Sequence, residues 1–115
     1  MAYSKKLAAR VREELSHLDN VTEKKMFSGI TFMVNGKMCI SVGPARIMCR
    51  INPLMHEEAI KRTGSATVLM KGREYKGYLF VSEDTIEKKA ELNYWVKLCL
   101  DYNIIAKASK KKKVI

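Results

Sequence analysis

The pattern of apolar and polar positions divides the chain into helical ends and a strand-rich middle. Within residues 3–18, apolar side chains recur every three or four positions, as on the buried face of an amphipathic helix. These side chains are Leu7, Val11, Leu15 and Leu18. From Ile30 to Val42 the period changes to two, which is typical of β-strands. The pattern therefore predicts a first helix that closes at Asp19-Asn20, with residues 21–25 leading into a pair of strands.

The two apolar runs of this middle segment meet at Asn35-Gly36, a dipeptide typical of tight β-hairpins. A two-residue turn there places Phe32 opposite Cys39. A three-residue loop, with Gly36 left-handed as a bulge, instead pairs Phe32 with Met38. We prefer the second register because it gathers the larger apolar side chains on one face.

The chain beyond the hairpin predicts a third strand and a short helix. Residues 46–51 alternate, so that Ile47, Cys49 and Ile51 face one side and Arg46, Met48 and Arg50 face the other. Asn52-Pro53 combines a capping side chain with proline at the first helical position, and predicts a helix that ends near Arg62.

Two more strands and a long helix complete the pattern. The strands cover residues 66–70 and 75–81, and Gly77 marks a bend or a close backbone approach. Asp84 and Glu87 resemble a capping box and predict the start of a helix that reaches Ile105. Its buried stripe comprises Leu92, Trp95, Val96, Cys99 and Tyr102.

The predicted order is helix, three strands, helix, two strands, helix. Short turns between consecutive strands favour an antiparallel sheet, and the fold class is α+β, a two-layer domain with helices packed on the sheet. The length of 115 residues and the apolar content of 47% suit one domain. We assign residues 1–106 to this domain and residues 107–115 to a lysine-rich tail, which we expect to be disordered.

Charge and cysteine content narrow the class of protein. The formal net charge is +10, and half of the excess lies in the tail, as Lys107, Lys110, Lys111, Lys112 and Lys113. No window approaches the ~20 apolar residues of a membrane span, so we expect a cytoplasmic protein without a membrane partner. The three cysteines include no C-x-x-C pair, which argues against a disulfide framework and a zinc site and favours buried thiols.

Residues suited to catalysis are few. His17 and His56 each fall on a predicted helix among polar neighbours, and surface positions are expected for both. The sequence holds no phosphate-binding glycine loop and no nucleophile motif. Arg50 beside Cys49 could activate the thiol, but strand alternation points neighbours to opposite faces, which favours a structural cysteine. We expect no catalytic residues, no metal and no cofactor.

Two surfaces are candidates for binding a partner. The first is the outward side of the third strand, with Arg46, Met48 and Arg50, which suits a protein partner or self-association. The second suits nucleic acid: Lys71, Arg73 and Lys76 lie among three aromatic residues, and the tail adds Lys110, Lys111, Lys112 and Lys113. Six methionines could also line an adaptable groove, although core packing is the commoner role of methionine. They are Met26, Met33, Met38, Met48, Met55 and Met70.

Four segments resemble one protein family. KKMFSGITFMVNGKMCISV (24–42), RIMCRINP (46–53), GREYKGYLFV (72–81) and LNYWVKLCLDYN (92–103) resemble the N-terminal domain of the TfoX/Sxy family of competence regulators. Ser28-Gly29 stands where the family has a glycine pair, and the C-terminal domain of the full-length regulators has no counterpart here. The resemblance implies a stand-alone domain with a regulatory or protein-binding role and carries over no catalytic residue.

These observations lead to two hypotheses about function. The first is a noncatalytic regulatory module that acts through a protein partner or as a homodimer, using a sheet face or edge. The alternative is a nucleic-acid-binding accessory protein that uses its basic surface and the lysine tail.

Overall fold

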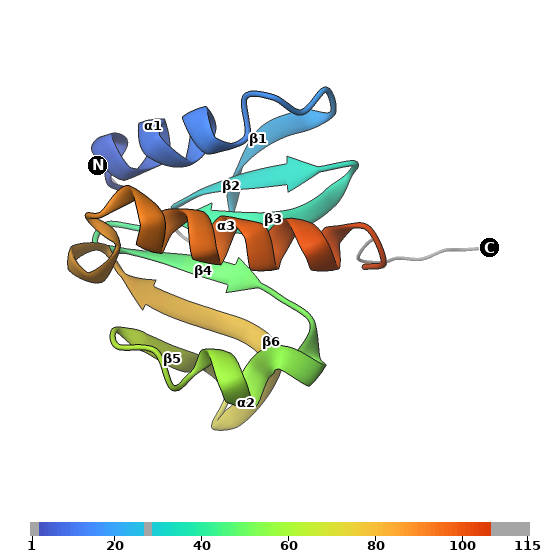
Figure 1. Cartoon of the computed structure of the whole chain (residues 1–115). Helices are drawn as coiled ribbons and strands as arrows, with labels where there is room; N and C mark the ends of the chain where they lie inside the picture. The colour runs from blue at the N-terminus through green and yellow to red at the C-terminus, as the bar shows by residue number, and fades with distance from the viewer. Residues whose placement is uncertain (1–2, 27–28, 107–115) are drawn as a thin grey trace.

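A six-stranded antiparallel sheet forms one layer of the protein, and helices packed on one of its faces form the other (Figure 1). The computed structural model describes residues 3–26 and 29–106. The strand order is β1-β2-β3-β4-β6-β5. The elements are α1 (Lys5–Glu14), β1 (Val21–Met26), β2 (Gly29–Val34), β3 (Lys37–Val42), β4 (Arg46–Arg50), η1 (Pro53–Met55), α2 (His56–Ala59), β5 (Ser65–Met70), β6 (Arg73–Ser82), η2 (Glu83–Ile86) and α3 (Lys89–Asn103), where η denotes a 3₁₀ helix.

The predicted α+β class and two-layer arrangement are confirmed, with one strand added at the sheet edge. Residues 21–25, expected to lead into the hairpin, belong to β1, which pairs with β2 from Val21 opposite Val34 to Met26 opposite Gly29. The observed order is therefore α-β-β-β-β-α-β-β-α. Sequence periodicity missed β1 because five of its six residues are exposed, and its charged side chains protect an edge rather than build a core.

The β2–β3 hairpin combines features of both expected registers. Its turn has two residues, with Asn35 at φ 55° and Gly36 at φ 77°. Met33 pairs with Met38, but a bulge then shifts the pairing, so that Phe32 lies opposite Ile40. Both predicted partners of Phe32 were wrong, because the bulge inserts one residue and lets the hairpin bury an apolar set on each face.

Two glycines permit backbone contacts that a side chain would block. A Cβ at Gly29 would lie 2.1 Å from the carbonyl oxygen of Val42. Gly77 has φ +91°, and a Cβ there would lie 2.9 Å from the carbonyl oxygen of Ile51. The predicted close approach at Gly77 is confirmed, and the bulge there reverses the faces of the residues that precede it in β6, so that Tyr75 pairs with Val68.

The helical layer differs from expectation mainly at helix ends. Helix α1 begins at Ser4, whose side chain accepts a hydrogen bond from the Leu7 backbone nitrogen, and it ends at Glu14 rather than near Leu18. The Asn52 side chain caps the Leu54 nitrogen as predicted, but the first turn is 3₁₀ and α2 stops at Ala59. Asp84 does not cap the last helix, because residues 83–86 form η2 and α3 begins only at Lys89.

The main core lies between the sheet and the helices. Four residues of the predicted stripe on α3 are buried there, namely Leu92, Trp95, Val96 and Cys99, whereas Tyr102 is half-buried. Trp95 and Phe32 are the largest fully buried side chains. Phe27, which lies in the apolar segment before the hairpin, is outside the described residues.

Candidate functional site

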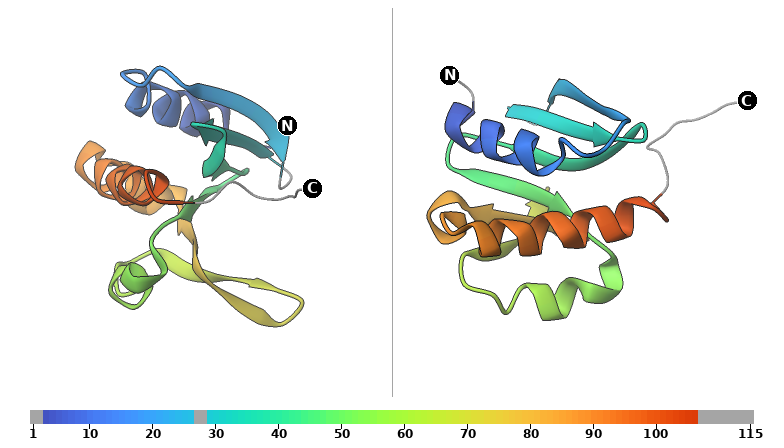
Figure 2. Two further views of the ribbon diagram at one scale, coloured as in Figure 1. Left: turned by 90° about the vertical axis from the view of Figure 1, so that its right-hand side faces the viewer. Right: turned by 45° about the horizontal axis from the view of Figure 1, so that its top comes forward.

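The described helices all lie on one face of the sheet, and none of them covers the opposite face, as Figure 2 shows. We call this opposite side the outer face. One row of cross-strand neighbours defines it from β1 to β5: Lys24, Thr31, Ser41, Met48, Phe80 and Ala66. Residues paired across strands share a face. The pairing therefore shows, for each remaining strand residue, whether its side chain lies on the outer face or on the helix side.

A small apolar cluster forms the floor of the outer face. Met38, Met48 and Val68 are buried in it, and Met33, Tyr78 and Phe80 pack against them. Three of the six methionines thus meet on one face, as the groove interpretation requires, whereas Met26 and Met55 lie outside this cluster. Met48 is only 5% exposed, so it belongs to the floor and not to an exposed patch.

The two arginines that flank Met48 on β4 lie against aromatic rings. The Arg46 guanidinium carbon is 3.5 Å from the centre of the Phe80 ring. That of Arg50 lies 5.9 Å from the Tyr78 ring centre and 5.6 Å from that of Tyr102. Such contacts orient the guanidinium plane while its edge can still donate hydrogen bonds to another group. Of the predicted surface residues Arg46, Met48 and Arg50, the two arginines are therefore cations oriented by aromatic rings, and Met48 is part of the apolar floor beneath them.

Charges are divided unequally between the two sides of the sheet. The described strands carry two acidic residues, Glu23 and Glu74. Both belong to the helix side, since Glu23 pairs with the buried Phe32, and Glu74 pairs with Leu69, the neighbour of the outer-face residue Val68. Among the described strand residues, the outer face carries cations and no acid. These cations are Lys24, Arg46, Arg50 and Arg73.

The ion pairs of the described residues all lie on the helix side of the sheet. Arg12 and Glu23 are 2.7 Å apart, and this contact holds the pKa of Glu23 below its usual range. The other pairs are Lys61–Glu58, Arg62–Glu91, Lys76–Glu57 and Lys97–Asp101. Within residues 3–26 and 29–106, Lys24, Arg46 and Arg73 take part in no ion pair. Lys24, Arg46 and Arg73 thus carry charges that no ion pair of the described residues neutralises.

The three described basic residues proposed for nucleic acid, Lys71, Arg73 and Lys76, do not share one face of the sheet. Lys71 occupies the β5–β6 turn at φ 52° and Arg73 lies on the outer face, but Lys76 points to the helix side and bonds to Glu57. Tyr75 is 41% exposed and packs edge-on against Tyr78. Lys110, Lys111, Lys112 and Lys113 lie outside the described residues.

His56 is buried, in contrast to the surface position expected from the sequence. Its exposed fraction is 1%. Nδ1 accepts a hydrogen bond from the Gly77 backbone nitrogen at 2.9 Å, and Nε2 lies 2.8 Å from Thr67 Oγ1. Because Nδ1 is the acceptor, Nε2 carries the proton in the neutral ring. Burial lowers the pKa of His56, and the positive charge of Lys76 lowers it further.

The three cysteines meet in the main core. Cys99 on α3 shares the main core cluster with Cys39 on β3 and Cys49 on β4, and all three are buried, as predicted. The contact with Cys99 and burial raise the pKa of Cys39, and burial raises that of Cys99. Because a thiolate is the reactive form, these contacts favour unreactive structural thiols.

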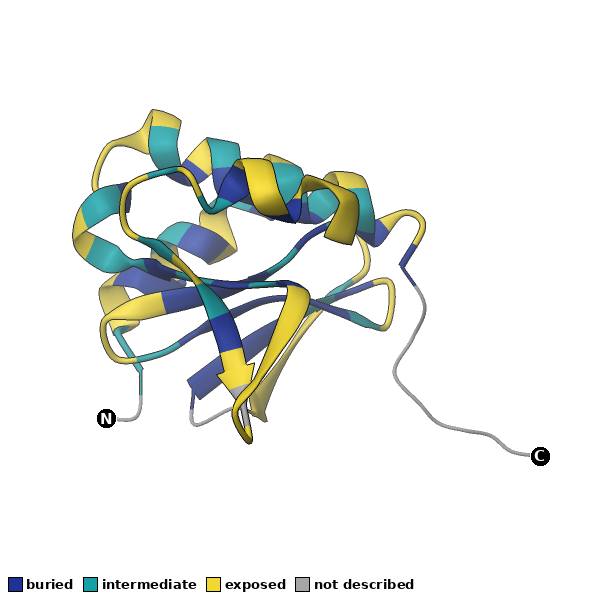
Figure 3. Cartoon of the chain, turned by 90° about the horizontal axis from the view of Figure 1, so that it is seen from below, coloured by how far each residue is buried: buried dark blue, intermediate teal, exposed yellow. Residues whose placement is uncertain are grey.

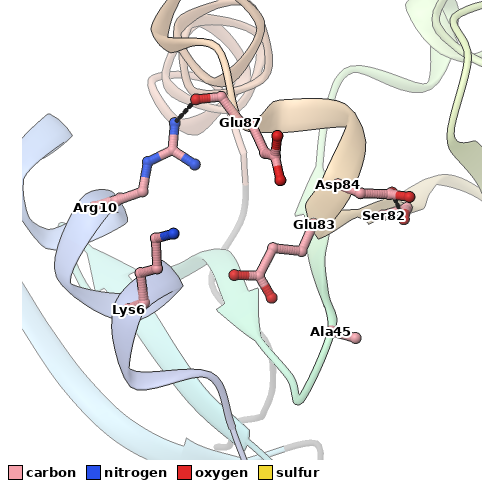
Figure 4. A pocket seen from close by; sticks show the side chains of 7 residues that line it. All are labelled: Lys6, Arg10, Ala45, Ser82, Glu83, Asp84 and Glu87. Atoms are coloured by element: carbon pink, nitrogen blue, oxygen red, sulfur yellow. Dashed lines mark hydrogen bonds between the residues drawn. The ribbon is translucent and has the colours of Figure 1, made fainter.

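A pocket of about 400 Å³ lies between α1 and the segment from Ser82 to Glu87 (Figure 4). Lys6 and Arg10 line one wall, and the opposite wall carries the carboxylates of Glu83 and Glu87. Arg10 donates to the Glu87 carbonyl oxygen at 3.0 Å, and Ser4 Oγ donates to the Glu83 carboxylate at 3.2 Å. The described lining holds no histidine and no cysteine, and its hydrogen bonds link α1 to η2.

Taken together, these features define a small α+β domain with an open, cationic sheet face. Residues 13–102 match the family model of the TfoX N-terminal domain, and the chain belongs to that family. This confirms the resemblance seen in the sequence. Comparison with curated proteins and with solved structures gave no match. In the described part of the chain, no helix is long and apolar enough to cross a membrane.

Proposed function

We propose that this protein is a noncatalytic regulatory module, like the N-terminal domain of a competence regulator, that binds a protein partner through the outer face. The observation that carries the proposal is the composition of that face. Methionine, aromatic residues and arginine are enriched at the centres of protein interfaces, whereas lysine is depleted there. The outer face presents Met33, Tyr78, Phe80 and two arginines that contact aromatic rings, and has Lys24 only at its edge.

Absence of catalysis is part of the same proposal. Reactive cysteines sit in exposed, electropositive surroundings, whereas the three thiols here lie in the main core. The ring of His56 is engaged at both nitrogens by the protein itself. The three thiols and His56, which could act as nucleophile or base in other proteins, are therefore engaged in packing and hydrogen bonding within this one.

The nucleic-acid alternative has less support from the described residues. Lys76 is engaged by Glu57 on the helix side, and the Phe80 ring, which could stack on a base, carries the Arg46 guanidinium. A continuous basic track with free aromatic faces is what single-strand binding needs. Binding through the outer face therefore favours a protein over a nucleic acid.

Photo-crosslinking tests this proposal. Tyr75, half exposed on the outer face, is replaced by p-benzoylphenylalanine in cells that contain the protein, and adducts are identified by mass spectrometry. We expect one defined protein adduct, and we expect it to vanish when Arg46→Glu is added. The matched control places the crosslinker at Lys97, which is exposed on α3. An equal adduct from Lys97, or an adduct that nuclease removes, contradicts the proposal.

A further inference from the structure

We infer that the outer face receives an acidic segment of the partner in which carboxylates alternate with apolar side chains. This inference rests on the proposed function and names the chemistry of the partner. Among the described strand residues, this face offers cations without acids, and the partly buried side chains of Met33, Tyr78 and Phe80 lie beside them over a buried floor of methionine and valine. A segment that combines negative charge with apolar groups complements both features.

The separation of the cations sets the spacing of the partner's charges. Arg46 and Lys24 are both exposed and belong to no ion pair of the described residues. Lys24 lies on β1, three strands away from β4, about 14 Å across the sheet. We therefore expect carboxylates of the partner at least about 14 Å apart, with an apolar side chain between them.

The guanidinium groups suit carboxylates better than isolated lysines would. A guanidinium donates two parallel hydrogen bonds to a carboxylate and stays charged at every physiological pH. Arg46 is held against Phe80 before any partner arrives, so less side-chain entropy is lost on binding. Its exposure leaves the outer edge of the group accessible to the partner.

A second copy of the chain does not fit the same face. Two outer faces brought together would oppose Lys24, Arg46, Arg50 and Arg73 with an identical set of cations. Like charges across an interface are costly when water is removed. The face is therefore a site for a partner of opposite charge, and self-association through it is not expected.

The probe for this inference is a fluorescein-labelled peptide that repeats Glu-Glu-Leu-Phe. A length of ~16 residues gives a helix of ~24 Å, which matches the width of six strands. Fluorescence anisotropy then measures its binding to the full chain. Two further probes are the same peptide with Leu and Phe replaced by Ser and Gly, and a single-stranded oligonucleotide of similar length.

Two double variants with equal net charge separate the outer face from charge in general. Lys24→Gln/Arg73→Gln removes two cations from the outer face, and Lys61→Gln/Lys97→Gln removes two from the helix side. All four side chains are exposed, so both proteins are expected to fold. We expect the first variant to weaken peptide binding about fivefold to tenfold and the second to change it less than about twofold.

The inference is overturned if the full chain does not bind the acidic peptide, or if both variants lose affinity for it equally. It is also overturned if the Ser/Gly peptide binds as well as the peptide with Leu and Phe, or if the oligonucleotide binds more tightly through the same residues. Failure here is distinguishable from failure of the proposed function. A protein adduct at Tyr75 without binding of the acidic peptide retains a protein-binding role and rejects only the acidic partner. If neither a protein adduct at Tyr75 nor binding of the acidic peptide is observed, both the proposed function and the inference about the partner are rejected.

Discussion

At the scale of single residues, His56 connects three elements through one ring. It begins α2, accepts from Gly77 on β6 and contacts Thr67 on β5. The groups that face it carry mixed charge, since Lys76 lowers its pKa and Glu57 and Glu74 oppose that effect, while burial dominates. A protonated ring would place a proton on Nδ1 against the Gly77 N–H, so the fold selects the neutral form.

This contact predicts how stability depends on pH. The unfolded chain binds a proton at His56 near the ordinary pKa of ~6.5, whereas the folded chain binds it only at lower pH. Stability is therefore unchanged above that value and falls as pH drops below it, by at most ~1.4 kcal/mol per pH unit. Guanidinium unfolding between pH 7 and pH 5 measures this slope.

The two histidines provide an internal control. His17→Gln should leave the slope between pH 7 and pH 5 in place, because His17 is exposed at the end of the first helical region. His56→Gln should reduce the slope. If His56→Gln retains the full slope, another group causes it and the assignment is wrong.

At the scale of elements, two hairpin turns with the same backbone carry different sequences. Asn35 and Gly36 have φ values of 55° and 77°, and Lys71 and Gly72 have 52° and 77°. Positive φ at both central positions is the type I′ turn, for which Asn-Gly is preferred. Lysine in the left-handed region is strained because its Cβ crowds the backbone.

Replacing Lys71 with asparagine should therefore stabilise the protein. We expect Lys71→Asn to raise the free energy of unfolding by about 0.5–1 kcal/mol, since asparagine tolerates this conformation better. Denaturant titration gives the change. Lys71→Gln removes the same charge, but glutamine does not share asparagine's tolerance of positive φ, so this variant should have no comparable effect. Equal stabilisation by the two variants would assign the gain to the loss of the charge instead.

At the scale of the whole molecule, the sheet separates two environments. The helix side holds the main core, the thiol cluster and all ion pairs of the described residues, and the outer face holds cations and the small methionine cluster. Three elements, β3, β4 and α3, supply one cysteine each to the thiol cluster. Figure 3 shows that buried residues extend along the strands beneath the exposed helix surfaces.

The thiol cluster predicts slow modification by Ellman's reagent. Buried thiols react only when the two layers separate, and the raised pKa values of Cys39 and Cys99 slow their reaction further, so the folded protein should label at the rate of opening. All three cysteines should label rapidly in denaturant. Ala9→Cys, at an exposed position of α1, provides a fast-labelling control. Rapid labelling of the unmodified native protein would show that the cluster is accessible.

The sequence by itself determined the elements whose signal is local. Periodicity located the first helix, the hairpin strands and the stripe on α3, and Asn52 and Gly77 were interpreted correctly because capping and close approach leave marks at single residues. The same periodicity separated Arg46, Met48 and Arg50 from the core side of β4. The family resemblance was also visible at this level.

Only the tertiary structure decided which distant residues meet. Edge strand β1 has almost no buried face, the bulges at Phe32 and Gly77 change which face a residue joins, and His56 is buried by strands that follow it in the chain. The division of charge also depends on these events, because one shifted residue moves every later side chain of a strand to the other face. Local pattern fixes where strands form, whereas register and packing fix what each face presents.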